Sequence, residues 1–194
     1  FELPLFGITR DWHGTAVNPP AGFSLAVDPA RLWFIASHGL PAQLHPDARP
    51  GRFQPGLWRH DVAELFLSDP AGGRYLEFNL APNGAWWSAG FHSPRVPDDD
   101  GPPAGVECHA PLAPDGAWMA AMSVPIAELE ARIAFGPDTR ANVCLILASP
   151  GQRFLTATDL GGGEPDFHRP DRFARLRFHS LEELPGLPAG EPGS

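Results

Sequence analysis

Lysine is absent from this chain, and no long apolar run occurs in it. All of its 14 basic residues are arginines, scattered along the chain against 23 acidic residues, and the formal net charge is −9. Nucleic acids and anionic membranes are bound through clustered positive charge, so we expect neither as a partner. No apolar run approaches the roughly 18 residues that a membrane-spanning helix needs, which predicts no membrane segment.

Cysteine is scarce as well. Cys108 and Cys144 are the two cysteines, and both lie within apolar, strand-like runs. This position favours buried free thiols over a single disulfide, and it leaves the compartment open. The first residues lack the basic segment followed by an apolar one that marks a secretory leader, which favours the cytoplasm over export.

Proline and glycine, in contrast, are abundant. The chain has 24 Pro and 21 Gly, yet 43% of its residues are hydrophobic, which indicates a loop-rich globular protein rather than a disordered one. Short apolar segments alternate with turn residues, a spacing typical of all-β sandwiches. The predicted strands are 23–27, 32–37, 62–67, 74–81, 85–91, 106–112, 117–124, 142–149 and 173–178.

We therefore predict an all-β protein, a β-sandwich of two mainly antiparallel sheets with a jelly-roll or immunoglobulin-like arrangement. One domain should span 1–180, followed by a flexible tail at 181–194, where few apolar residues are available for packing. A short helix is expected near 125–131, because Pro125 is followed by acidic residues, as helix N-termini prefer.

Two nearly continuous apolar runs, 31–37 and 143–148, are typical of central strands that are covered on both faces. In 62–67 and 74–81, apolar residues at every second position predict which face of each strand packs in the core. The predicted core contains Trp33, Ile35, Leu65, Leu67, Phe78, Leu80, Leu145 and Leu147.

The opposite face of the hairpin formed by 62–67 and 74–81 is polar. It carries Glu64, Glu77 and Asn79, and Trp58 lies where the first strand begins. Carboxylates and an amide can hydrogen-bond sugar hydroxyls while an indole ring stacks on the apolar face of a pyranose. The alternative is an ordinary solvated sheet face with Trp58 capping the core.

Three long connections, 38–57, 93–105 and 160–171, interrupt the strands. Long loops on a rigid sandwich are common sites of recognition, so we expect ligand contacts there.

Five sequence pieces, in order, resemble a known family. They are Trp-x-x-Asp-x-x-Glu-Leu-Phe-Leu from Trp58, Tyr-x-x-Phe-x-x-x-Pro-x-Gly from Tyr75, Val-Pro-Ile-x-x-Leu from Val124, a strand that opens with Asn142, and the segment 165–170. Together they resemble the family 9 carbohydrate-binding modules and the related DOMON-like domains over about 23–178. The resemblance implies a β-sandwich that binds a saccharide, or another small polar ligand, and is not an enzyme.

In these modules the sugar lies between two Trp rings and is held by Glu, Arg and Asn. The resemblance implies that Trp58 is the first ring, Glu64 the acidic ligand and Asn79 the amide. Glu77 stands where the modules have Arg, and Phe167 and His168 are offered where the second Trp is expected. Because Glu64 and Glu77 would share an acidic face, we expect a ligand that is neutral or cationic, or that brings a metal ion, and we expect acidic sugars to be refused.

The sequence offers residues for two other functions, glycoside hydrolysis and haem binding. Glu64 and Glu77 could act as the acid and base of a glycoside hydrolase, but a sheet face beside open loops offers little to desolvate a carboxyl. Some DOMON relatives bind haem, and Met119 or Met122 could be an axial ligand. Alternation in 117–124 places the two methionines on opposite faces, so at least one belongs to the core and haem is not expected.

Metal binding has one candidate. Asp98, Asp99 and Asp100 precede a glycine and could offer oxygen ligands to a structural calcium ion, although a solvated acidic turn is the simpler interpretation. The eight histidines show no spacing typical of a transition-metal site.

Overall fold

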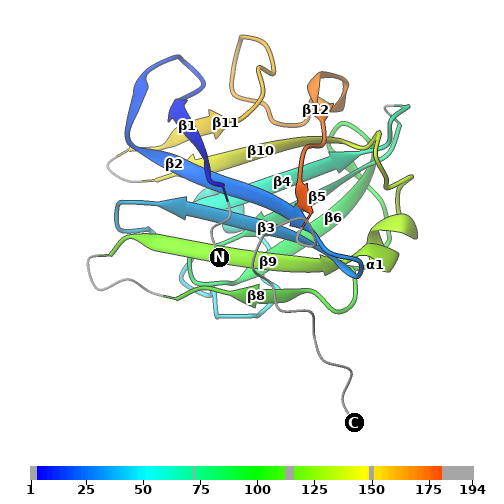
Figure 1. Ribbon diagram of the computed structural model, residues 1–194. Helices are drawn as coiled ribbons and strands as arrows, with labels where there is room; N and C mark the ends of the chain where they lie inside the picture. Colours follow the sequence, from blue (N-terminus) through cyan, green and yellow to red (C-terminus); the bar gives the residue numbers. More distant parts are fainter. Residues whose placement is uncertain (1–3, 72, 112–115, 149–150, 181–194) are drawn as a thin grey trace.

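The computed structural model describes residues 4–71, 73–111, 116–148 and 151–180. They form a β-sandwich of two layered sheets, with a single short α-helix in the described part of the chain, at one end of the sandwich (Figure 1). The fold class is therefore confirmed. The tail predicted at 181–194 lies outside the described residues.

The first sheet has the strand order β1-β2-β3-β9-β8, and β13 pairs with β2. The β13–β2 pair is parallel and the other pairs are antiparallel. The strands are β1 (Phe6–Arg10), β2 (Ala16–Val27), β3 (Arg31–His38), β8 (Glu107–His109), β9 (Trp118–Pro125) and β13 (His179–Ser180).

The second sheet has the order β11-β10-β4-β5-β6-β7, with β12 beside β10, and all of its strand pairs are antiparallel. Its strands are β4 (Val62–Ser68), β5 (Tyr75–Leu80), β6 (Trp86–Ser93), β7 (Val96–Pro97), β10 (Arg140–Leu147), β11 (Arg153–Thr156) and β12 (Ala174–Arg175). Helix α1 (Ile126–Glu130) confirms the predicted helix, and two 3₁₀ turns, η1 (Leu57–Arg59) and η2 (Pro170–Arg172), complete the elements. Among the helices described, none has the length and apolar character that crossing a bilayer requires.

The inner faces of both sheets bury one hydrophobic core. β4, β5 and β10 contribute six of the predicted core residues, each no more than 2% exposed: Leu65, Leu67, Phe78, Leu80, Leu145 and Leu147. Alternation thus assigned the inner face of the second sheet correctly, because a strand packed on one side turns every second side chain inward.

The prediction that β3 is covered on both faces is wrong. Leu32, Phe34 and Ala36 are buried in the core, whereas Trp33 and Ile35 are partly exposed on the outer face of the first sheet. An apolar run gave no sign of this alternation, since residues on both faces are apolar. Trp33 satisfies its indole N–H by donating to Asp28 Oδ2 at 2.7 Å.

β1, β11 and the first half of β2 were not expected from the sequence. Pro19 and Pro20 within β2 suggest a loop, because proline cannot donate to a strand ladder. The structure accommodates both prolines where the β1–β2 register shifts between Ile8 and Arg10, and β3 pairs only with the later residues 22–27. Neither proline therefore interrupts a regular ladder.

The two cysteines lie in different sheets and are unpaired in the structure. Cys144 is fully buried in β10 of the second sheet and Cys108 is partly buried in β8 of the first.

The two methionines of β9 provide a matched test of the layer assignment. Met122 is fully buried in the core and Met119, three residues earlier on the same strand, is 48% exposed. We expect Met122→Ala to lower the free energy of unfolding by about 2–5 kcal/mol through the lost burial and the cavity left behind. Met119→Ala should change it by about 0.5 kcal/mol or less. Urea unfolding of both variants measures the difference, and equal losses would contradict the layer assignment.

Candidate functional site

The outer face of the second sheet is covered rather than solvated. On β4 and β5 this face carries Val62, Glu64, Phe66, Tyr75, Glu77 and Asn79, and each is 5% exposed or less. A second hydrophobic cluster, which includes Leu57, Leu160, Phe167 and Phe173 from the connections, lies over it. The alternative of an ordinary solvated sheet face is therefore wrong.

A cavity of about 630 Å³ opens on this covered face. Two of the three long connections supply part of its wall: Arg95 and Pro97 belong to the second, and the segment 165–168 belongs to the third. Trp58, which directly follows the first connection, also lines the cavity. The sheet supplies the remainder. Its lining residues are Trp58, Glu64, Glu77, Trp87, Phe91, Arg95, Pro97, Ile146, Phe154, Pro165, Asp166, Phe167 and His168.

Two carboxylates meet in this cavity because of the β4–β5 register. Glu64 lies opposite Asn79, and Glu77 lies opposite Phe66, so the two glutamates are diagonal neighbours on adjacent strands. They are 3% and 5% exposed, respectively. Among the residues that the structure describes, no arginine forms an ion pair with either of them.

Burial strongly perturbs both acids. Desolvation raises the pKa of Glu64 well above its usual value, and the nearby Glu77 raises it further. Desolvation raises the pKa of Glu77 to about 7, although the Asn79 amide favours its ionised form. The expectation that this face could not desolvate a carboxyl is therefore wrong, since both glutamates are buried on it.

His168 connects the acid pair to the rim of the cavity. Its Nε2 lies 3.7 Å from Glu77 Oε2, and its Nδ1 lies 2.8 Å from the Tyr75 hydroxyl. The Arg95 backbone N–H donates to the same hydroxyl at 3.1 Å. Burial and the nearby Arg95 lower the pKa of His168, with Asp166 acting in the opposite direction. The imidazole is therefore favoured in its neutral form at neutral pH.

Aromatic rings form the rest of the wall. Trp58 is 50% exposed on η1, and the Arg59 guanidinium lies 4.9 Å from its ring centre. Phe167 is mostly buried and packs against Trp12 and Phe154, with both pairs of ring centres 6.1 Å apart.

Trp87 of β6 is a lining residue that the sequence analysis missed. It pairs with Asn79 across the β5–β6 ladder, and cross-strand partners share a face of the sheet. Extending the alternation from 74–81 into the next strand would have identified it.

Asn79 does not line the cavity. It is fully buried behind the carboxylates, and its side-chain amide makes no hydrogen bond of good geometry within the described residues. Its effect on Glu77 is consistent with a supporting position in the sheet.

This fold is similar to that of several solved structures. A candidate carbohydrate-binding protein from Bacteroides uniformis superposes with a TM-score of 0.73 and 16% identity, over 91% of this chain and 87% of that one. A family 9 carbohydrate-binding module from Caldicellulosiruptor kristjanssonii, in complex with cellotriose, superposes with a TM-score of 0.60 and 13% identity, over 97% of this chain and 88% of that one. The glucose complex of a family 9 module from the same organism superposes with a TM-score of 0.59 and 15% identity, over 92% of this chain and 86% of that one.

The chain therefore has the fold of a family 9 carbohydrate-binding module. The resemblance to family 9 modules expected from the five sequence pieces is confirmed at the level of the fold, and the resemblance to DOMON-like domains stays a prediction. The sequence matches no protein-family model and none of the curated proteins, and at these identities the likeness establishes the fold alone.

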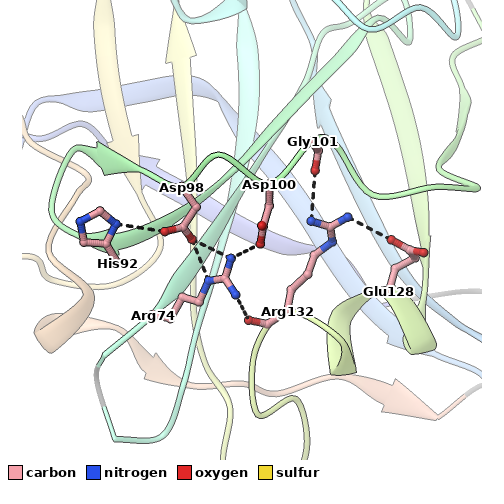
Figure 2. A network of polar contacts seen from close by, with 7 residues as sticks. All are labelled: Arg74, His92, Asp98, Asp100, Gly101, Glu128 and Arg132. Atoms are coloured by element: carbon pink, nitrogen blue, oxygen red, sulfur yellow. Dashed lines mark hydrogen bonds and ion pairs between the residues drawn. The ribbon is translucent and has the colours of Figure 1, made fainter.

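Two carboxylates of the acidic turn at 98–100 contact the guanidinium of Arg74. Figure 2 shows Arg74 between two carboxylates: its Nε donates to Asp98 Oδ2 at 2.7 Å, and its Nη2 contacts Asp100. His92 Nδ1 lies 3.0 Å from Asp98 Oδ1. Burial disfavours ionisation of Asp98, but its hydrogen bonds with His92 and Arg74 outweigh burial and lower its pKa.

The same network fixes the segment that carries Arg95. Arg132 extends it by donating to the Gly101 carbonyl and to Glu128 of α1 (Figure 2). Gly90 permits the close approach, because a Cβ there would lie 2.9 Å from Asp98 Oδ2.

The structure does not bring Asp98, Asp99 and Asp100 together as the predicted calcium site. In the described parts of the chain, no three His, Cys, Asp or Glu side chains gather to hold a metal ion. Arg74 supplies positive charge to two of the three carboxylates. Calcium binding by this turn stays a prediction.

The acid pair predicts how stability depends on pH. Because the pKa of Glu77 is about 7 in the folded protein against a usual 4.5, ionisation opposes folding as pH rises between these values. Glu77→Gln should therefore raise the free energy of unfolding by up to about 3 kcal/mol near pH 8, and the gain should disappear near pH 4.

Urea titrations at the two pH values measure this difference. Glu130→Gln, which changes an exposed carboxylate of α1, is the matched control and should alter stability little at either pH. A gain for Glu77→Gln that is equal at both pH values would contradict the assignment of a buried, perturbed acid.

Proposed function

We propose that this chain is a non-catalytic saccharide-binding module whose ligand occupies the cavity on the second sheet. One observation carries the proposal: a buried pair of carboxylates lies at the floor of a cavity that the indole rings of Trp58 and Trp87 flank. Ligand pockets commonly combine apolar walls with a few converging polar groups in this way.

Each part of the cavity matches one property of a sugar. A pyranose presents an apolar C–H face, which an indole ring can cover, and hydroxyl groups, which carboxylates can hydrogen-bond. Glu64 and Glu77 provide acceptors, or one donor and acceptors when the pair holds a proton. His168 lies beside Glu77, and Phe167 packs against Trp12 and Phe154 in the wall.

The comparisons support the same class of ligand. The solved complexes of the Caldicellulosiruptor module contain cellotriose and glucose, and the Bacteroides protein is named for carbohydrate binding. These ligands belong to the other proteins, and we use them here as the first probes for this chain.

Removal of either indole should weaken binding. We expect Trp58→Ala and Trp87→Ala each to raise the Kd for a sugar ligand by roughly 5-fold to 150-fold, the equivalent of about 1–3 kcal/mol for one oriented aromatic contact. Isothermal titration with glucose and cellotriose measures the change. Trp33→Ala, on the outer face of the first sheet, is the matched control and should leave the Kd unchanged.

The proposal fails if no sugar binds, or if the two cavity variants bind as tightly as the unchanged protein. A circular dichroism spectrum of each variant shows whether the fold has been kept.

Glycoside hydrolysis is a second candidate, favoured by one observation. The pKa of Glu77 is raised to about 7, close to that of a general acid, while its neighbour Glu64 is also perturbed. Sustained release of reducing sugar from glucans or xylans, lost in Glu64→Gln and Glu77→Gln, would establish an enzyme. We expect no release, because the proposal is of a binding module.

The two candidate haem ligands, Met119 and Met122, lie on β9 of the first sheet, whereas the cavity lies on the second sheet. Met122 is fully buried in the core and Met119 lies on the outer face of β9, so neither lines the cavity. We expect the purified protein to be colourless, which a visible absorption spectrum tests directly.

A further inference from the structure

We propose that the cavity selects an amino sugar, a hexose that carries a protonated amine, over the neutral hexose of the same shape. This inference rests on the proposed saccharide function and specifies its ligand class. It is carried by a buried acid pair that lacks a counterion, inside a wall of aromatic rings.

The acid pair is incompletely satisfied by the protein. Glu64 is 3% exposed and lines the cavity, and its side-chain carboxylate makes neither a hydrogen bond nor an ion pair with any residue that the structure describes. Glu77 has one basic neighbour, His168, at 3.7 Å, longer than a hydrogen bond. Buried carboxylates are normally paired, so these two present unused acceptors to whatever enters the cavity.

The other charged groups around the cavity do not compensate for the pair. Arg95 lies at the rim, where its Nη2 contacts Asp166 Oδ1 at 2.8 Å, and Asp166 neutralises it. The pKa of His168 is lowered by burial, and burial raises that of Tyr75 to about 12, so both side chains are favoured in their neutral forms. Cys144, which faces Glu64 from β10, is held as a thiol for the same reason.

The walls favour a cation as well. Five aromatic side chains line the cavity, namely Trp58, Trp87, Phe91, Phe154 and Phe167. The negative faces of aromatic rings attract cations, and the attraction strengthens where water is excluded. An ammonium group offers three N–H donors, enough to reach both carboxylates, and a hydroxyl offers one.

The sharpest test compares each amino sugar with its own parent sugar. Glucosamine, galactosamine and mannosamine place the same amine in different surroundings and are titrated beside glucose, galactose and mannose near pH 6.5. We expect at least one amino sugar to bind about tenfold or more tightly than its parent, because a charge-assisted hydrogen bond is stronger than a neutral one. Its N-acetyl derivative, which has no charge, should lose this advantage, and glucuronate should bind more weakly than glucose.

Variants of the acid pair show whether the preference comes from these residues. Glu77→Gln and Glu64→Gln keep side-chain size and remove one ionisable carboxyl group each, and we expect each to reduce the preference to about threefold or less. Trp33→Ala should keep the full preference. Because the pair must lose a proton to receive the cation, binding of the amino sugar should release a proton while binding of the parent sugar should not. Titration in two buffers of different ionisation enthalpy counts that proton.

Three outcomes separate the two proposals. Binding of neutral hexoses as tight as that of all three amino sugars would overturn the preference and leave the saccharide function standing. A preference that survives in both Gln variants would assign it to other groups and overturn this inference. Binding of no sugar at all would overturn the saccharide function and the inference together.

Discussion

The β4–β5 hairpin has two buried faces, and the arrangement of the cavity depends on this constraint. Its inner face contributes Leu65, Leu67, Phe78 and Leu80 to the core, and its outer face places Glu64 and Glu77 in the cavity. A shift of one residue in register would exchange the faces, move the leucines out of the core and put the glutamates into it. Packing of the core therefore fixes the position of the acid pair.

The acid pair is costly to bury, and the fold tolerates the cost. Desolvation opposes the ionised form of both carboxylates, and in the described residues the protein supplies no cation to either at hydrogen-bond distance. The large core between the sheets, formed along the whole length of the long strands, provides the stability against which this cost is set.

Residues from distant parts of the chain meet around the cavity. The segments around Trp58, Arg95 and Phe167 come from three separate parts of the chain, and they reach the same cavity because the second sheet brings their strands side by side. The network of Arg74, Asp98 and Asp100 fixes the segment that follows β7. Polar contacts within the protein thus hold this segment in place.

The sequence by itself determined the sandwich, the single helix and the inner faces of β4 and β5, because local alternation and turn residues report these features directly. It also predicted that Trp58, Glu64, Glu77 and Asn79 share a surface, and the family resemblance added Phe167 and His168. All of these except Asn79 line one cavity. It could not determine that β3 has an exposed face, since apolar residues occupy both of its sides. Only the tertiary structure decided that the acid face is buried and that Arg74 pairs with the acidic turn. Burial and ion pairing depend on segments distant in sequence, and a local pattern of residues carries no information about which of those segments will cover it.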